Sequence, residues 1–171
     1  AALYGRVEPE AVLQTNGATG ANLLAVLALV SRGDHVIAEY PSYQQLYDIP
    51  RALGAEVDLW RIYEDRGWYP DLGELERLVR PDTRLICLNN ANNPTGTFLD
   101  RAFMEQVADI ARSVGAFVLV DEVYLPLVGT EDFASIADIY ERGVATNSLS
   151  KTYSVPGARI GWTASSPQIA E

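Results

Sequence analysis

The sequence predicts a three-layer α/β fold in which helices cover both faces of an open, mostly parallel sheet that contains one antiparallel strand. Short β-rich apolar runs alternate with helical patterns, as in sheets built from crossover units. The run Phe-Val-Leu-Val at 117–120 is apolar throughout, which is typical of a central strand covered on both sides. Only ten residues lie between 148 and 159, whereas a parallel crossover with its own helix needs about 10–12 at least. We therefore expect 159–164 to run antiparallel to the other strands.

The individual elements are predicted from their periodicity and their flanking residues. The helix at 100–114 has Phe103, Val107 and Ala111 on one stripe, and Asp100 is placed to cap its first turn. Gly33 and Gly54 each follow a helical pattern, where a left-handed residue commonly ends a helix. The strands are expected at 13–15, 35–39, 56–61, 85–89, 117–121, 144–148 and 159–164. The helices are expected at 20–30, 43–53, 71–80, 100–114 and 133–141.

Composition narrows the class of protein. The 171 residues suffice for one domain, and neither a repeat nor a linker divides them. A formal net charge of −10 argues against a nucleic-acid binder, because phosphate backbones are held by basic surfaces. The longest apolar run, 21–30, is too short to span a membrane and is interrupted by Asn22. The single cysteine, Cys87, excludes a disulfide framework and a multi-cysteine metal site. Residues 1–10 contain no secretory apolar stretch, so a cytoplasmic protein is expected.

Lysine is almost absent from this chain. Twelve of the 13 basic residues are arginine, and the one lysine is Lys151. A lysine amine can lose its proton and condense with a carbonyl, which a guanidinium does not do. The alternative is an ordinary surface lysine, and composition alone does not separate the two.

The chemically distinctive stretches all follow predicted strands. In an open α/β sheet, ligands bind beyond the carboxyl ends of the strands. An antiparallel last strand would begin at this same edge and bring Arg159 to it. The stretches at this edge are 16–21, 39–43, 90–96, 121–124 and 148–151.

Each stretch has a possible role in binding and an ordinary structural one. The glycine-bracketed turn at 17–20 opens a helix, so the free N–H groups of Ala18 and Thr19 could bind a phosphate. A tight turn that needs glycine for its backbone is equally compatible. Ser148 and a half-buried Arg159 could add donors to the same phosphate. Asp121, at the end of an apolar strand, needs a cation or donors, or caps the next turn.

Three motifs in this order resemble a known family. Asn-Asn-Pro-Thr-Gly at 92–96, Asp-Glu-Val-Tyr at 121–124 and Ser-Leu-Ser-Lys at 148–151, with Arg159 eight residues later, resemble fold-type I enzymes that use pyridoxal 5′-phosphate (PLP). The closest resemblance is to the class I and II aminotransferases, and it covers nearly the whole chain. It implies the fold of the large domain of these enzymes.

The resemblance implies a role for each residue around the cofactor ring. Lys151 would form the Schiff base and carry a proton between the substrate and the cofactor. Asp121 would pair with the protonated ring nitrogen. Tyr43 would stack on the ring, while Asn93 and Tyr124 would hydrogen-bond its 3′ oxygen. Lys151, Asp121 and Tyr124 would thus be the catalytic residues.

The resemblance likewise implies how the phosphate is held. The backbone N–H groups of Ala18 and Thr19, the hydroxyls of Thr19 and Ser148, and the Arg159 guanidinium would bind it. The implied substrates are an amino acid and a 2-oxo acid, and the implied full-length enzyme is a homodimer. No metal is implied.

Two departures from the family leave alternatives open. Family members are longer, so residues 1–171 are expected to be a large domain without the small carboxyl-terminal domain. That small domain carries an arginine for the substrate carboxylate, and no residue here matches it. The alternatives are a PLP-dependent carbon–sulfur or β-eliminating lyase, a PLP-binding sensor domain of a transcription regulator, and a structural domain without a cofactor. His35 is expected to face solvent and Cys87 to be a small buried residue.

Overall fold

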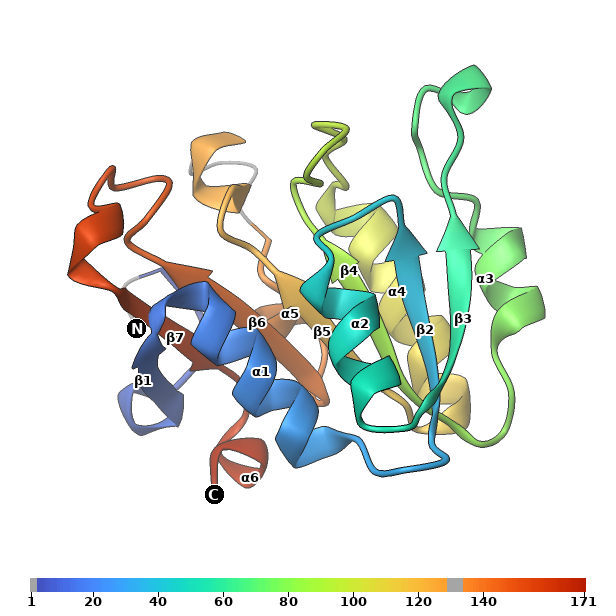
Figure 1. The fold of residues 1–171 in the computed structure, drawn as a ribbon, viewed down its shortest axis with the longest axis horizontal. Coiled ribbons are helices and arrows are strands. Elements are labelled where there is room, and N and C mark those ends of the chain that lie inside the picture. The colour runs from blue at the N-terminus through green and yellow to red at the C-terminus, as the bar shows by residue number, and fades with distance from the viewer. Residues whose placement is uncertain (1–2, 129–133) are drawn as a thin grey trace.

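The computed structural model describes residues 3–128 and 134–171, which form one sheet flanked by helices (Figure 1). The strands are β1 (Val12–Asn16), β2 (His35–Tyr40), β3 (Glu56–Arg61), β4 (Thr83–Asn89), β5 (Phe117–Asp121), β6 (Gly143–Ser148) and β7 (Ile160–Ala164). The helices are α1 (Gly17–Leu29), α2 (Gln45–Ala52), α3 (Leu72–Leu78), α4 (Arg101–Val114), α5 (Ile136–Ile139) and α6 (Pro167–Ala170).

The sheet is mixed, with a single strand running against the rest. Its order is β1-β7-β6-β5-β4-β2-β3, and β7 pairs antiparallel with both of its neighbours. The pairs β2–β3, β2–β4, β4–β5 and β5–β6 are parallel. The predicted antiparallel strand is therefore confirmed, and with it the predicted fold class.

Two apolar cores lie on opposite faces of the sheet. Along β4 the side chains alternate, with Ile86 and Leu88 in one core and Leu85 and Cys87 in the other. Helices α4 and α5 cover the face that carries Ile86 and Leu88, and helices α1 and α2 cover the face that carries Leu85 and Cys87. The fold therefore has three layers (Figure 1). The central strand β5 is buried on both faces, as its continuous apolar run predicted.

The helices begin and end near their predicted positions, with two informative differences. Helix α1 begins at Gly17 instead of residue 20, because the glycine turn is itself the first turn of the helix. Of the helix expected at 133–141, Phe133 lies outside the described residues. The described helix is Ile136–Ile139, where Ser135 caps the start and an extended Tyr140 stops it. Asp100 caps α4 as predicted, with its Oδ1 2.8 Å from the Phe103 N–H nitrogen.

His35 is buried, so the expectation that it faces solvent was wrong. Its Nδ1 lies 2.8 Å from Thr83 Oγ1 and its Nε2 lies 3.1 Å from Asp58 Oδ2. Both partners come from strands adjacent to β2, so the imidazole joins three strands at the end of the sheet opposite the distinctive loops.

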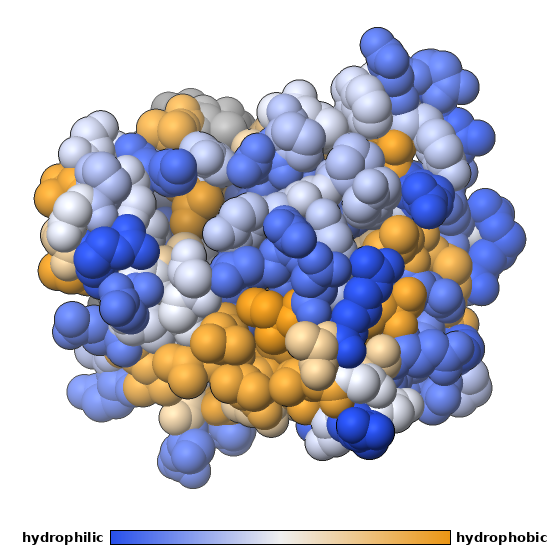
Figure 2. Space-filling model, in the orientation of Figure 1, coloured by the Kyte–Doolittle hydropathy of each residue, from blue (hydrophilic) through white to orange (hydrophobic). Residues whose placement is uncertain are grey.

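Helix α1 is apolar on nearly all sides. Leu23, Leu24 and Leu27 remain exposed on its outer face, and Figure 2 shows an apolar surface over this helix. No helix within the described residues is both long and apolar enough to cross a membrane.

Candidate active site

The distinctive loops meet at one edge of the sheet, because the ends of the strands are in register there. Asp121 lies opposite Asn89 on one side and Thr146 on the other. Ser148 lies opposite Gly161, and Ile160 lies opposite Asn16 at the start of α1. These pairings enclose a cavity of about 250 Å³. All nine residues that the sequence placed in the site line it: Ala18, Thr19, Tyr43, Asn93, Asp121, Tyr124, Ser148, Lys151 and Arg159.

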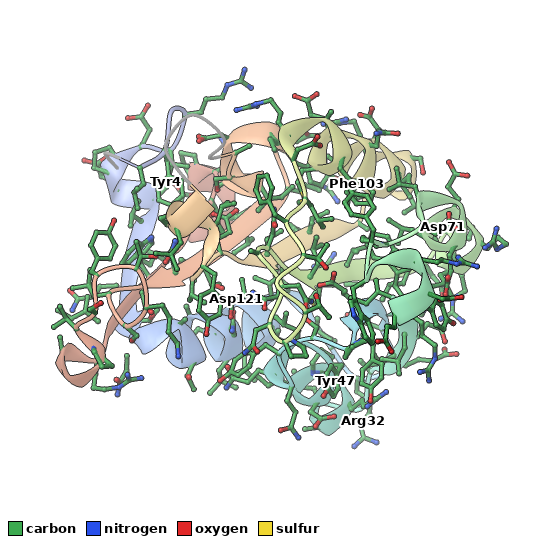
Figure 3. The ribbon with its side chains drawn as sticks, turned by 90° about the horizontal axis from the view of Figure 1, so that it is seen from above. Tyr4, Arg32, Tyr47, Asp71, Phe103 and Asp121 are labelled. Atoms are coloured by element: carbon green, nitrogen blue, oxygen red, sulfur yellow. The ribbon has the colours of Figure 1, made fainter. Side chains whose placement is uncertain are left out.

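Asp121 lies on the inner wall of this cavity and is 2% exposed. Figure 3, which looks down on this edge, shows it near the middle of the molecule, between the two helix layers. Its Oδ2 accepts a hydrogen bond from Asn22 Nδ2 at 2.8 Å, and its Oδ1 accepts one from the Val123 N–H at 3.2 Å. Burial raises the pKa of Asp121, and these two donors act in the opposite direction.

The start of α1 forms a backbone cup at the other end of the cavity. Gly17 has a φ of +68°, and the Asn16 side chain makes no capping hydrogen bond to the helix. The first N–H groups of a helix have no acceptor within it, so those of Ala18 and Thr19 are available to an anion. Strand β7 touches this cup: a Cβ on Gly161 would lie 2.3 Å from the Gly17 carbonyl carbon.

Arg159 lies against the cup but is exposed, so the expectation that it is half-buried was wrong. A Cβ on Gly17 would lie 2.5 Å from Arg159 Nη2, which shows how closely the guanidinium approaches the turn. Arg159 also lies outside β7, with a φ of +52°, and its Nη1 donates to the Pro156 carbonyl at 2.9 Å. Arg159 thus has a left-handed backbone just before β7, and it is exposed to solvent.

Lys151 and Tyr124 face each other across the mouth of the cavity. The Lys151 Nζ lies 5.7 Å from the centre of the Tyr124 ring, within the range of a cation–π contact. Lys151 is exposed, whereas Ser148 at the end of β6 is buried and its Oγ accepts from the Ser150 N–H at 3.3 Å. The turn after β6 thus directs a buried hydroxyl and an accessible amine toward one space.

Asn93 is held in place by a residue that the sequence did not single out. Asn89 Oδ1 accepts from the Asn93 N–H at 2.7 Å, and Asn89 Nδ2 donates to the Asp121 carbonyl at 2.7 Å. Asn89 therefore ties the loop after β4 to the end of β5. Tyr43 is half-buried, packs against the core and also lines the cavity.

Two glutamates near the ends of β2 and β5 are buried, and Glu39 supports the loop after β4. Glu39 Oε2 accepts from Asn92 Nδ2 at 2.9 Å and from the Asn89 N–H at 3.1 Å. Burial raises the pKa of Glu39 to about 7. Glu122 follows Asp121 and points to the opposite face of the sheet from it, where its Oε1 accepts from the Ser135 hydroxyl at 3.0 Å and from the Ile136 N–H at 2.9 Å. Burial raises the pKa of Glu122 to about 8.

Sequence reasoning missed Asn22, Asn89 and Glu39 as parts of the site. Each left a signal, since each is a polar residue that directly follows apolar residues of its helix or strand. Within the described residues, no group of three or more His, Cys, Asp or Glu side chains is placed to hold a metal ion.

Comparisons with known proteins agree with the fold and with the motifs. A family model described as aminotransferase class I and II matches residues 1–171. The aspartate aminotransferase of Thermotoga maritima is 34% identical over 169 residues, which cover 96% of this chain and 44% of that protein. The capreomycidine synthase of Streptomyces vinaceus is 32% identical over 166 residues, which cover 95% of this chain and 43% of that protein.

Solved structures give the same picture. A PLP-dependent aminotransferase from Streptococcus suis superposes with a TM-score of 0.89 at 54% sequence identity, covering 99% of this chain and 45% of that one. The aspartate aminotransferase structure from Thermotoga maritima has a TM-score of 0.87 at 34% identity. The chain spans less than half the length of each of these relatives.

Proposed function

The chain belongs to the class I and II aminotransferase family, and from this premise we propose that it is the PLP-binding large domain of an aminotransferase. One observation carries the proposal: the only lysine, a buried aspartate and the cup at the start of α1 line the same cavity. The proposed substrates are an amino acid and a 2-oxo acid. The proposed full-length enzyme is a cytoplasmic homodimer.

The residues on the cavity wall fit the chemistry of this cofactor. A phosphate needs backbone donors and a positive charge, which Ala18, Thr19 and Arg159 offer. A protonated ring nitrogen needs a buried carboxylate, and Asp121 is 2% exposed with two donors on its oxygens. The close approach of Gly161 to Gly17 leaves no room for a side chain behind the cup, so the phosphate would rest against backbone.

When bound, PLP supplies an aldehyde that condenses with amines and a ring that accepts electrons from the substrate carbon. Lys151 would bind that aldehyde through Nζ and, once released, would carry a proton from the substrate Cα to the cofactor. Asp121 would hold the proton on the ring nitrogen. Tyr124 and Asn93 would donate to the 3′ oxygen, and Tyr43 would stack on one ring face.

The relatives support a class of reaction but not one substrate. One is named for aspartate, whereas a protein from Pseudomonas aeruginosa with 32% identity is named arginine–pyruvate transaminase. We therefore propose amino-group transfer without choosing the amino acid. Product analysis separates this from a lyase, because transfer gives a new amino acid whereas elimination releases ammonia.

The single lysine makes the test unusually direct. The purified protein is mixed with PLP, its visible absorption is recorded, and borohydride reduction is followed by peptide mass spectrometry. We expect a visible band and a covalent adduct on the peptide that contains Lys151. Lys151→Ala should lose both, and so should Lys151→Arg, which keeps the charge but cannot condense with an aldehyde. A band and an adduct that persist in both variants would show that Lys151 is not the attachment site.

A further inference from the structure

Asn22 is a polar residue in the apolar helix α1. It lies on α1 among Ala21, Ala25 and Val26 and is 0% exposed. Its Nδ2 lies 2.8 Å from Asp121 Oδ2, and its Oδ1 lies 2.6 Å from Thr146 Oγ1. A buried amide without partners is costly, so both ends of this side chain need the contacts they make.

The direction of each hydrogen bond follows from the chemistry of the three groups. An ionised carboxylate only accepts, so the Asn22 atom that faces Asp121 is its NH₂ group. The Asn22 oxygen then faces Thr146, whose hydroxyl must donate. A directed chain thus runs from Thr146 on β6 through Asn22 on α1 to Asp121 on β5. The other Asn22 amide hydrogen is within reach of Gln45 Oε1, at 3.4 Å.

We propose that Asn22 and Thr146 are positioning residues for Asp121, and that together they fix the orientation of its carboxylate toward the cavity and stabilise its negative charge. Neither residue lines the cavity, so neither touches a bound molecule and both act only through Asp121. The proposal rests on the proposed function in one respect, namely that Asp121 pairs with the ring nitrogen of PLP.

The hydrogen bond from Asn22 lowers the pKa of Asp121. Burial is the largest influence on Asp121 and raises its pKa, while the hydrogen bond from Asn22 is the larger of the two influences that lower it. Removal of Asn22 therefore raises the pKa further and favours the neutral acid, which cannot balance a protonated ring nitrogen. The charged or titratable groups near Asp121 are Glu122, which follows it on the chain, and Lys151, Arg159, Tyr43 and Tyr124 on the cavity wall.

The first test needs no cofactor. Protein labelled with ¹³C at the aspartate carboxyls is titrated by NMR, and the Asp121 signal is assigned with Asp121→Asn. Asn22→Leu should raise the Asp121 pKa by about one unit or more, since a hydrogen bond to a charged group is worth about that much. Val26→Ala, on the same helix but outside the hydrogen-bond chain, should leave it unchanged.

A second pair of variants keeps the proposal testable if Asn22→Leu does not fold. Thr146→Val removes only the hydroxyl and should raise the Asp121 pKa less than Asn22→Leu does, while Thr146→Ser keeps the hydroxyl and should restore the original value. A purely structural role would shift melting temperatures without this pattern. An Asp121 titration that is the same in wild type, Asn22→Leu and Thr146→Val would overturn the proposal.

The second test measures whether the loss of Asn22 weakens PLP binding through Asp121. Asn22→Leu should weaken PLP binding about tenfold, as expected for one pKa unit of lost charge stabilisation. In the Asp121→Asn background the same substitution should have little further effect, because its target is gone. Equal losses in both backgrounds would refute the assignment. If the wild-type protein does not bind PLP, the proposed function fails, and the cofactor-free titration still decides the role of Asn22.

Discussion

Glu39→Gln should change how the stability of the protein depends on pH. The Glu39 carboxyl is 1% exposed at the end of β2. Its Oε2 accepts from Asn89, Asn92 and Ser42, while its Oε1 has no hydrogen-bond partner. Burial raises its pKa from an ordinary 4.5 to about 7, against the influence of those three donors. Glutamine resembles the protonated acid in shape and charge and does not titrate.

The direction and magnitude of the change in unfolding free energy follow from the pKa values of Glu39 in the unfolded and folded states. The folded protein holds this proton more tightly than the unfolded chain, so the stabilisation is complete below pH 4.5 and is lost as the pH rises to about 7. The difference of 7 − 4.5 = 2.5 units corresponds to about 3 kcal/mol at about 1.4 kcal/mol per unit. Relative to wild type, the variant should therefore gain about 3 kcal/mol in unfolding free energy across this window.

Urea denaturation of both proteins between pH 4.5 and pH 8 measures this gain. Glu122 also has a raised pKa, but it is present in both proteins, so its contribution cancels in the difference. Glu141→Gln is the control: Glu141 is exposed, and its hydrogen bond with Arg112 lowers its pKa, so its replacement should show no gain with rising pH. A difference between wild type and Glu39→Gln that stays constant across the window would refute the reasoning.

Two further predictions follow from the structure. Gly161→Ala would place a Cβ 2.3 Å from the Gly17 backbone, so it should destabilise the protein by about 1–3 kcal/mol and weaken PLP binding, whereas Gly157→Ala, which meets nothing within 4 Å, should do neither. Thermal melts and PLP titration check this, and a Gly161→Ala protein that behaves like wild type would contradict it. Burial raises the pKa of the Cys87 thiol, so a thiol reagent should modify it only as fast as the protein unfolds. Rapid labelling of the native protein would show that Cys87 is accessible.

The fold could be predicted from the sequence because its signals are local. Apolar periodicity placed the strands and helices, and the short connection before Arg159 indicated that β7 is antiparallel. Nine residues on the cavity wall could be predicted as well, because each lies at or just beyond the carboxyl end of a strand, in the first turn of α1 or just before β7, whereas Asn89 on the same wall was missed.

The supporting residues could not be predicted because their partners are far away in the chain. Asn22 meets Asp121 across 99 residues, and Glu39 meets Asn89 across 50. His35 was expected to face solvent, yet it is buried and its partners come from neighbouring strands. The exposure of Arg159 depends on a left-handed backbone that its residue type does not favour.

The position of β1 at the edge of the sheet bears on how the protein acquires its shape during synthesis. Val12 pairs with Ala164, and β1 is joined to the sheet through β7 alone. Contacts this distant in sequence are slow to form, and they cannot form on the ribosome until β7 has emerged. The parallel pairs β2–β3, β2–β4, β4–β5 and β5–β6 can form earlier. The close approach of Gly161 to the turn at Gly17 therefore forms only after β7 has been made, so a nascent chain would have its aspartate in position before that contact closes behind the anion cup.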